Sequence, residues 1–469
     1  MMARSLVVLL ALGMIAAPAA GAAPRTLRVD YYHTGNAGEE RFSLDRVVVE
    51  PLEWPGNPAR PLDDTNLGKY FFEVVDPATN AVVYSRGFSS IYGEWETTGE
   101  AKAITRTFQE SLRFPTPDRP VQIVVKKRDA RNLFHEVWSI ALDPADMFVD
   151  PSPPPSAGPL VALQQSGDPA AKVDVLILGD GYTEAERPKF EKDARRLMAI
   201  LFSTSPFRER RNDFNVWGLS PAAAESGISR PSTGIHRRSP VGATYDAFGS
   251  ERYVLTFDNR AFCDLASQAP YEVVEILVNG ATYGGGGIFG QYSTVAADSA
   301  WAPYIFVHEF GHHVAGLADE YYTSDVAYAP AADRVEPWEP NATALLDRAR
   351  LKWGDLVDPG TPVPTPWPKD GFESYSLDTQ ARRRQIRAEG RPEAEMDALF
   401  RDERAHETRL LGSSPYARTV GAFEGAMYEA RGYFRPEVDC IMFTRDEVPF
   451  CRVCQRAISR VIDLYATEP

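Results

Sequence analysis

The interpretation of this chain starts from residues 306–322, which read FVHEFGHHVAGLADEYY. This stretch contains the pattern HExxH at residues 308–312. On a helix, positions i and i+4 share one face, so His308 and His312 can turn both imidazoles toward one metal ion. Glu309 lies beside the first histidine, where its carboxylate can take a proton from a water that the ion activates. Two imidazoles and a carboxylate, with an open fourth position, suit a single catalytic zinc ion.

The pattern is too specific to be dismissed as chance. With 7 His and 65 acidic residues in 469, a His-acid-x-x-His sequence is expected on the order of 0.01 times. Pro303 suits the first turn of a helix and Gly316 suits its end. The alternative is a helix whose histidines are merely packed or exposed, but three of the seven histidines lie here. His313 points about a third of a turn away from His312, so we expect it to be structural.

Several carboxylates are candidates for the third metal ligand. Asp319 is the favoured one and Glu320 is the alternative, in which case the other carboxylate holds a loop or a histidine N–H. Glu336, further along the chain, is a weaker candidate. The pattern approaches the HExxHxxGxxH/D shape of metzincins with one residue of difference. Gly316 lies four residues after His312 instead of three, and Asp319 lies seven after it instead of six.

Composition and charge restrict the class of protein. With 44% hydrophobic and 25% charged residues, the chain is typical of a soluble globular protein and not of a disordered or polytopic membrane protein. A length of 469 residues exceeds what one hydrophobic core usually supports, so two or three domains are expected. The net charge of −15 argues against a nucleic-acid partner, which requires a basic face.

Residues 1–23 have the pattern of a cleavable signal peptide. Arg4 precedes an apolar run over residues 5–20, and small residues follow at 20–23. An uncleaved anchor is the alternative, but the apolar run is short for a spanning helix and small residues end it. We therefore expect a secreted or periplasmic protein without a membrane span.

The four cysteines favour disulfides in such a compartment. Cys440, Cys451 and Cys454 lie within fifteen residues of one another and are the disulfide candidates, whereas Cys263 is remote. A redox-active CxxC is an alternative. A zinc knuckle is a weaker one, because it needs four nearby ligands and only three are local.

The remaining patterns predict an α+β protein in two main parts. Residues 24–149 alternate apolar and polar in short runs, including a hairpin signal across residues 70–84, and predict an all-β sandwich of accessory function. Residues 150–159, DPSPPPSAGP, predict a stiff linker. Residues 160–469 alternate strands with helices, beginning with a strand at 173–179 and a helix at 183–202 that Thr183 and Glu186 cap. Residues 376–411 predict a charged, solvated helical insertion or a partner surface.

The chain resembles the peptidase M64 family of secreted metallopeptidases, which includes an IgA-cleaving protease. The most specific likeness is HExxHxxxGLADEYY at residues 308–322. Shorter matches follow the family order, at GDGY 179–182, NVW 215–217, YGGGG 283–287, FEGAMY 423–428, GYFRP 432–436 and CIM 440–442. The resemblance implies a zinc-dependent endopeptidase with a zincin- or metzincin-like catalytic domain after the family's β-rich N-terminal domain. It does not imply IgA as substrate.

Further residues receive roles mainly from this resemblance. Met442 looks like the methionine of a Met-turn below the metal, with a plain core methionine as the alternative. Phe443 follows it where many metzincins carry a tyrosine that stabilises the oxyanion. Tyr433, or else Tyr428, is the substitute candidate, and Arg435 is a candidate for substrate binding. Taken singly, each of these three is more readily structural.

Two loops leave alternatives open. The glycine run at 283–287 is either an edge strand that pairs with extended substrate or a flexible loop. Asp180 and Tyr182 end a strand, where they hold a loop or a structural calcium ion.

Three functions therefore compete. The first is a zinc endopeptidase acting on protein or peptide substrates. The second is a zinc amidase or narrow-specificity exopeptidase acting on cell-wall or glycan-linked peptides. The third is an inactive zincin-like protein that serves binding or adhesion, and the intact His308, Glu309 and His312 count against it. Oligomeric state and cleavage specificity stay open.

Overall fold

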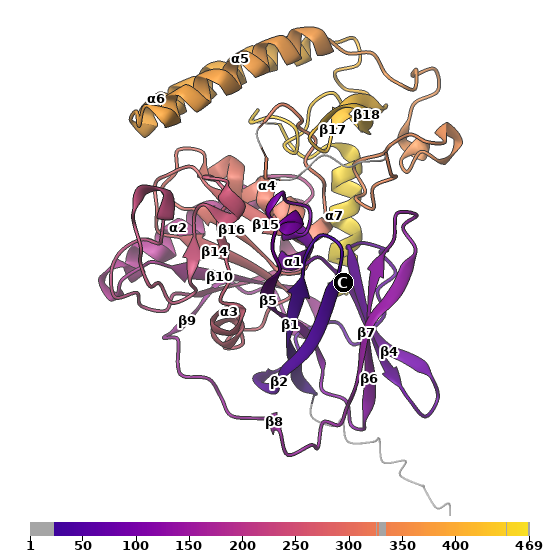
Figure 1. Cartoon of the computed structure of the whole chain (residues 1–469), viewed down its shortest axis with the longest axis vertical. Coiled ribbons are helices and arrows are strands. Elements are labelled where there is room, and N and C mark those ends of the chain that lie inside the picture. The colour runs from indigo at the N-terminus through magenta and orange to yellow at the C-terminus, as the bar shows by residue number, and fades with distance from the viewer. Residues whose placement is uncertain (1–22, 325, 328–333, 447, 468–469) are drawn as a thin grey trace, which may run out of the picture.

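The computed structural model describes residues 23–324, 326–327, 334–446 and 448–467. The predicted signal peptide therefore lies almost entirely outside the described residues. The chain has a mixed α+β fold with a β-rich N-terminal region (Figure 1). No helix among the described residues is long and apolar enough to cross a membrane.

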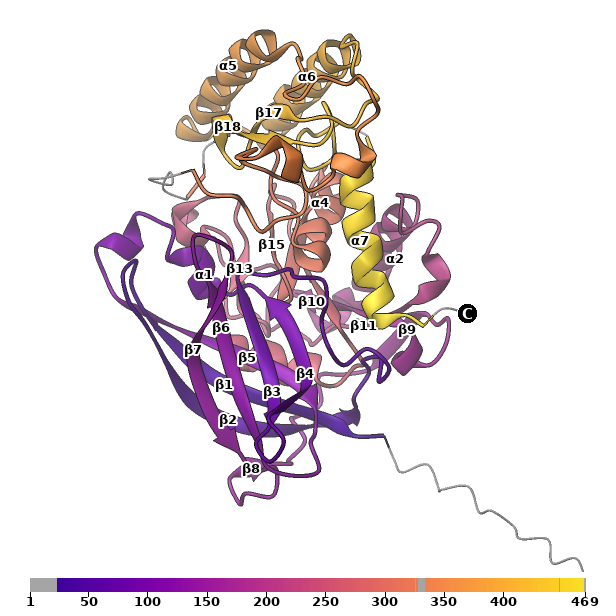
Figure 2. The same ribbon diagram turned by 90° about the vertical axis from the view of Figure 1, so that its right-hand side faces the viewer.

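The N-terminal region consists of two four-stranded sheets that pack face to face (Figure 2). Their strand orders are β5-β1-β2-β8 and β4-β3-β6-β7. Alternate side chains of β5 are buried, as expected for strands with one face on a core. The predicted hairpin is confirmed, since β3 and β4 pair antiparallel. The strands are β1 (Arg25–Gly35), β2 (Glu40–Glu53), β3 (Tyr70–Asp76), β4 (Ala81–Phe88), β5 (Arg106–Pro115), β6 (Val121–Arg128), β7 (Phe134–Leu142) and β8 (Val149–Asp150).

The Pro-rich segment after β8 is anchored to the second half of the chain. The Ala157 N–H donates to Oε1 of Gln268, and Nε2 of Gln268 donates to the Pro155 carbonyl. Gln268 follows helix α3 (Asn259–Ala266). The segment thus runs along the surface of the second half and leads into strand β9 (Leu160–Gln164).

A six-stranded mixed sheet organises the second half, in the order β15-β16-β14-β10-β11-β9. Its central strand β10 is buried at every position, and successive side chains point to opposite faces. Val175 and Ile177 face a core to which several helices contribute, whereas Leu176 and Leu178 face a second core that includes residues of α3. The other strands are β11 (Phe214–Leu219), β14 (Val273–Val278), β15 (Gly285–Ile288) and β16 (Tyr292–Ala296), around β10 (Val173–Asp180).

The helices on the first face include two that the sequence predicted. Thr183 and Glu186 form the expected capping box, and α2 (Arg187–Leu201) continues from it. Helix α4 (Ala302–Ala315) carries the HExxH residues. Helix α7 (Arg452–Tyr465) packs beside α4. Short β12 (Ala243–Thr244), β13 (Leu255–Thr256) and α1 (Ile91–Trp95) complete the second core.

The charged segment around residues 376–411 is helical as predicted, but it is not simply solvated. It forms α5 (Lys369–Ala388) and α6 (Glu393–Gly412), which lie side by side above the sheet (Figures 1 and 2). Phe400 of α6 is 1% exposed and packs against Tyr283 and Trp301. The apolar residues are too sparse to give a clear helical stripe in sequence, yet they bury one side of the pair.

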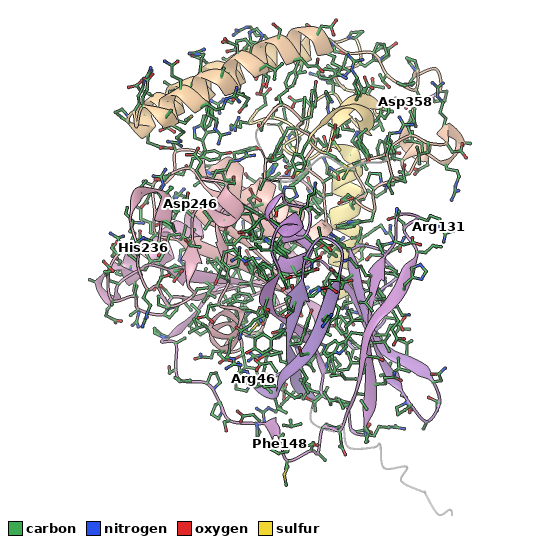
Figure 3. All side chains as sticks on the ribbon, viewed as in Figure 1. Arg46, Arg131, Phe148, His236, Asp246 and Asp358 are labelled. Atoms are coloured by element: carbon green, nitrogen blue, oxygen red, sulfur yellow. The ribbon has the colours of Figure 1, made fainter. Side chains whose placement is uncertain are left out.

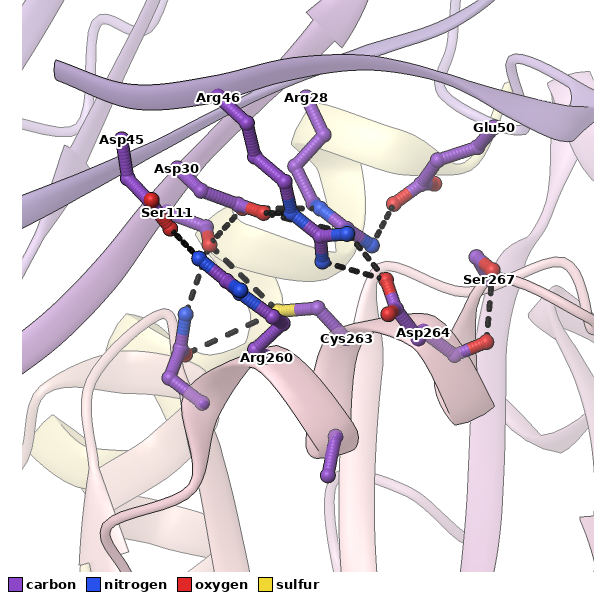
Figure 4. A network of polar contacts seen from close by, with 12 residues as sticks. Arg28, Asp30, Asp45, Arg46, Glu50, Ser111, Arg260, Cys263, Asp264 and Ser267 are labelled. Carbon is purple, nitrogen blue, oxygen red and sulfur yellow. Dashed lines mark hydrogen bonds and ion pairs between the residues drawn. The ribbon is translucent and has the colours of Figure 1, made fainter. Parts of the chain in front are cut away.

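A network of charged residues joins the sandwich to the second half (Figure 4). Arg28, which is fully buried, pairs with Asp30 and Glu50 of the sandwich and with Asp264 of α3. Arg46 also bridges Asp30 and Asp264, at 2.7 and 2.8 Å. Because these pairs cross between the two parts of the chain, they fix how the sandwich is seated.

Candidate metal centre and active site

Helix α4 presents the motif residues because its two ends are well defined. Pro303 occupies the first turn, as predicted. Gly316 ends the helix in the left-handed conformation, with φ of 56°. A Cβ at this position would lie 2.6 Å from Trp338, so both the conformation and the space require glycine. The turn at Gly316 sends the chain back toward the face of the helix that carries the histidines.

The two motif imidazoles face one another. Nε2 of His308 lies 3.1 Å from Nε2 of His312. The Nδ1 atoms are already engaged, since His308 Nδ1 lies 2.9 Å from the Ile441 carbonyl and His312 Nδ1 lies 2.5 Å from the Leu317 carbonyl. Each carbonyl accepts from an Nδ1–H, which leaves both Nε2 atoms as lone-pair donors aimed at a shared point.

The carboxylate of Asp319 completes this arrangement. Its Oδ1 lies 3.0 Å from His308 Nε2 and 3.2 Å from His312 Nε2, and its side chain is 8% exposed. Ligands 2.0–2.1 Å from a tetrahedral zinc ion lie roughly 3.3 Å apart. The separations of these three donor atoms therefore fit one zinc-sized ion between them.

The other two candidate carboxylates are directed elsewhere. Glu320 is fully buried, and its Oε1 accepts a hydrogen bond from Asn341 at 2.9 Å. Glu336 accepts from the hydroxyl of Thr343 and from the Ala344 N–H. Of the three carboxylates weighed from sequence, the structure brings Asp319 to the histidines.

Glu309 lies in the same cluster as the two histidines. One carboxylate oxygen and the imidazole nitrogens all lie within 4.8 Å of one another. Burial raises the pKa of Glu309 above 4.5, although the imidazoles of His308 and His312 partly offset this. For Asp319 burial acts in the same direction, but the two imidazoles outweigh it and hold its pKa well below 3.8. The two carboxylates near the imidazoles, Glu309 and Asp319, thus have proton affinities that are driven apart.

Two family models match most of the chain. The family model described as IgA Peptidase M64 matches residues 161–462, and the one described as Peptidase M64 N-terminus matches residues 21–139. The chain belongs to the peptidase M64 family. No curated protein matches the chain. The chain is therefore a peptidase of a metallopeptidase family, and its substrates are proteins or peptides.

In this M64 peptidase, a strained hairpin brings a tyrosine to Asp319. Strands β17 (Phe423–Ala426) and β18 (Glu429–Arg435) are joined by Met427 and Tyr428, whose φ angles are 53° and 66°. The Met427 N–H donates to the Asp319 carbonyl and the Tyr428 N–H to the Tyr321 carbonyl. The Tyr428 hydroxyl then donates to Asp319 Oδ2 at 2.5 Å. The backbone strain is maintained at the point where the hairpin contacts the site.

The remaining residues of this hairpin have different surroundings. The hydroxyl of Tyr433 accepts from the Val335 N–H at 3.2 Å, and both residues line the cavity described below. Arg435 is fully buried and donates to the carbonyls of Gly425 and Val438. Since its guanidinium is buried and hydrogen-bonded to backbone carbonyls, Arg435 cannot contact substrate, and its interpretation as a substrate-binding residue is wrong.

The loop carrying Met442 lies against the histidine site. Met442 is fully buried. The carbonyl of Ile441 accepts from His308, and the carbonyl of Met442 accepts from the Glu320 N–H at 2.9 Å. The loop thus contacts one motif histidine and the segment that carries Asp319.

The glycine run forms an edge strand and packs directly on α4. β15 pairs antiparallel with β16 at the end of the sheet. A Cβ at Gly287 would lie 2.5 Å from the Glu309 carbonyl and 2.9 Å from Cβ of His312. The absence of side chains therefore lets the motif helix approach the strand. A flexible loop, the other prediction for this run, is wrong.

A cavity of about 710 Å³ opens onto the motif residues. His308, Glu309, His312 and Asp319 line it from one side. The sandwich contributes another wall, so this part of the chain does not lie apart from the site. Figure 3 labels Arg131 at the tip of the β6–β7 loop, whose neighbours belong to that wall. Sandwich residues that line the cavity include Lys69, Ser89, Glu94, Thr97, Arg128 and Asn132.

Two contacts near the cavity were not predicted from the sequence. The hydroxyl of Tyr304 lies 3.2 Å from Nδ1 of His308. Arg252 lines the cavity and donates to the hydroxyl of Tyr321 at 3.2 Å. Tyr304 lies four residues before His308, and this i, i+4 spacing could have indicated their contact. Arg252 carries no comparable signal, because only the fold brings it near Tyr321.

The disulfide prediction is wrong for this structure. All four cysteines are free and buried. Sγ of Cys454 lies 3.4 Å from that of Cys451 and 3.9 Å from that of Cys440, whereas a disulfide bond is about 2.05 Å long. Cys263 is remote and lies beside Ser111 and Asn259 at the interface of Figure 4. The sequence placed three cysteines together but could not supply the fourth group that meets them.

The calcium alternative at Asp180 is not favoured by its contacts. Both carboxylate oxygens of Asp180 accept hydrogen bonds, from Ser239, Val241 and Ala243. Asp180 therefore holds the loop after β11, which is the other role predicted for it.

Proposed function

We propose that this chain is a secreted zinc-dependent endopeptidase in which His308, His312 and Asp319 hold the ion. The observation that carries the proposal is the convergence of two Nε2 atoms and one Oδ1 atom at separations of 3.0–3.2 Å. Both imidazoles are in the tautomer that ligation requires, because carbonyls accept from their Nδ1 atoms.

Glu309 acts as the general base in this proposal. When bound, the zinc ion supplies Lewis acidity, which polarises an amide carbonyl and lowers the pKa of a water from 15.7 to about 7. Glu309 lies beside the ligand atoms and faces the cavity, so its carboxylate is positioned to take a proton from the attacking water. It then returns that proton to the leaving amine.

Tyr428 serves as a positioning residue. Its hydroxyl holds Oδ2 of Asp319 at 2.5 Å, so that Oδ1 remains directed at the histidines. The earlier candidate Tyr433 stays a candidate donor to the oxyanion, because it also lines the cavity.

Extended substrate is proposed to pair with the outward-facing backbone groups of edge strand β15 at Gly287. Gly285 hydrogen-bonds outward to Arg252 and Val254, away from β16. Because hydrogen-bonding direction alternates along an antiparallel pair, the N–H and C=O of Gly287 also point away from β16. Gly287 is partly exposed and lines the cavity, where a substrate strand can use these groups.

A zincin- or metzincin-like assignment of the catalytic domain is part of the proposal. It is supported by the antiparallel edge strand beside α4, by the sharp turn at Gly316 and by the buried Met442 loop below His308. We propose domain boundaries at 24–149 for the sandwich, 150–159 for the linker and 160–469 for the catalytic domain.

The test is proteolysis of an unfolded protein by the full chain and by Glu309→Gln. We expect cleavage by the wild type, loss of cleavage after chelation, and a reduction of about 10²–10⁴-fold in kcat for Glu309→Gln with the zinc content unchanged. Zinc that stays bound to an inactive variant separates a lost base from a lost ion.

Other results would support the competing functions. Chelator-sensitive cleavage of small cell-wall or glycan-linked peptides alone would favour an amidase or exopeptidase. A full-length preparation that binds zinc without cleaving any substrate would favour the binding protein. Glu251→Gln, which changes a carboxylate that pairs with Arg387 outside the motif, is a control expected to retain activity.

A further inference from the structure

Three cysteines and a glutamate from distant parts of the chain meet in a second cluster. Cys440, Cys451, Cys454 and Glu320 are each at most 4% exposed. Each offers one ligand atom, and these four atoms all lie within 4.8 Å of one another. Glu320 follows α4, Cys440 precedes the Met442 loop, and the other two cysteines cap and begin α7.

The spacing of the cluster fits a metal ion better than a disulfide. The two measured Sγ–Sγ separations are 3.4 and 3.9 Å, and Cys454 Sγ lies 3.6 Å from Glu320 Oε1. With bonds of about 2.3 Å to sulfur and about 2.0 Å to oxygen, a tetrahedral ion separates two sulfurs by roughly 3.8 Å and sulfur from oxygen by roughly 3.5 Å. A disulfide would also use only two of the three cysteines and leave the third thiol unpaired.

Glu320 supplies an independent observation. Its Oε2 is buried and has no hydrogen-bond partner among the described residues, while its Oε1 accepts from Asn341. A buried carboxylate is unfavourable unless a cation or donors compensate it. The carboxylate nevertheless points toward three thiols, which as neutral groups provide little compensation.

Backbone N–H groups donate to the cysteine sulfurs. The Cys451 N–H donates to Sγ of Cys440 at 3.2 Å, and the Cys454 N–H donates to Sγ of Cys451 at 3.5 Å. Cys451 is also the N-cap residue of α7, where the helix dipole stabilises negative charge. Arg435, which is fully buried, interacts electrostatically with Glu320 and Cys440. Thiolate ligands with a carboxylate select zinc over the harder cations.

We propose that Glu320, Cys440, Cys451 and Cys454 form a second zinc site, which is structural because four protein ligands close it. The site would stabilise the segments that position Asp319 and His308. Glu320 directly follows Asp319, and its N–H donates to the Met442 carbonyl. The same loop provides the Ile441 carbonyl that accepts from His308. One ion therefore links the segment of Asp319 to the loop that orients His308.

The first test is a zinc count on the full chain, purified without chelator. We expect two ions per wild-type chain, one in Cys454→Ser, and one in the double variant His308→Ala, His312→Ala. Cys263→Ser is the matched control and should keep two, since Cys263 is buried but remote from the cluster. If the histidine site fails to bind zinc, the wild type holds one ion that only the cysteine variants lose, so the two proposals fail separately.

The second test uses cobalt as a spectroscopic probe. Wild-type protein exchanged into Co²⁺ should show intense thiolate-to-cobalt charge-transfer absorption that survives in the His308→Ala, His312→Ala variant. In Glu320→Gln, which preserves side-chain size, a chelator should remove this cobalt at least about tenfold faster. Thiol titration of denatured, chelator-treated protein should find four free cysteines. A disulfide among the three cysteines, or cobalt spectra without thiolate absorption, would overturn the proposal.

Discussion

The hydroxyl of Tyr428 donates to Oδ2 of Asp319 at 2.5 Å, across 109 residues of sequence. The contact depends on two consecutive non-glycine residues with positive φ, and backbone hydrogen bonds tie that turn to residues 319 and 321. Such strain persists only where the surrounding structure enforces it. Tyr428 therefore helps to hold the Asp319 carboxylate in place.

Replacing Tyr428 by Phe should weaken the site without removing a ligand. Loss of the hydroxyl frees the Asp319 carboxylate to rotate, so we expect zinc affinity to fall by about 10–100-fold and kcat to fall with it. Zinc competition with a chelating dye measures the affinity. Tyr375→Phe, a matched change on α5 where the ring stacks on His406, should change neither. Unchanged zinc affinity in Tyr428→Phe would show that Asp319 is held by other groups.

Replacing Gly287 by Ala should disturb the contact between α4 and β15. The added Cβ would lie 2.5 Å from the Glu309 carbonyl and 2.9 Å from the His312 Cβ, so the helix must move. We expect destabilisation of about 1–3 kcal/mol in urea unfolding, together with loss of peptidase activity. Gly412→Ala, where a Cβ meets nothing within 4 Å, is the control. Full activity in Gly287→Ala would contradict the close packing.

Replacing Arg28 by Met should destabilise the interface between the sandwich and the second half of the chain. Arg28 is fully buried among Asp30, Glu50 and Asp264, and its removal leaves buried carboxylates without their partner. Breaking such a network costs about 3–5 kcal/mol. Arg41→Met removes an exposed pair with Glu39 and should have little effect. Because the sandwich lines the cavity, limited proteolysis and activity should change in the first variant only.

The stability of the sandwich should fall as pH rises through the pKa of His33. Burial of this ring disfavours its charge, but Glu110 and Glu40, each 3.0 Å away, outweigh burial and raise the pKa of His33 above 6.5. A histidine whose pKa is raised by folding contributes its full share of the unfolding free energy below its unfolded pKa, here 6.5. This contribution is lost as pH rises from 6.5 through the folded pKa. The other groups around the ring or its partners are Tyr31, Phe42, Tyr70, Tyr92 and Lys127.

The measurement is urea unfolding of wild type and His33→Gln across this pH range. The difference in unfolding free energy between the two proteins should shrink as pH increases. His236→Gln, on an exposed ring (Figure 3), should follow the wild type at every pH. A difference that stays constant with pH would mean that folding does not raise the pKa of His33.

Local patterns predicted much of the fold. Alternating apolar residues indicated the strands of the sandwich, and Thr183 with Glu186 marked the start of α2. These signals are short-range, because strand alternation and helix capping involve neighbours along the chain. The burial of one side of α5 and α6 was missed, since it depends on residues such as Tyr283 that lie more than a hundred positions earlier.

By itself, the sequence determined that His308, Glu309 and His312 share a turn of helix, because helical geometry sets the i, i+4 contact wherever that helix forms. It also placed Gly316 at the helix end. Only the tertiary structure decided which of Asp319 and Glu320 lies beside the two histidines, since these neighbours in the chain point to different clusters. It likewise brought Tyr428 and the three cysteines to these two carboxylates. Contacts across more than 100 residues arise from packing of the whole chain, which no local spacing encodes.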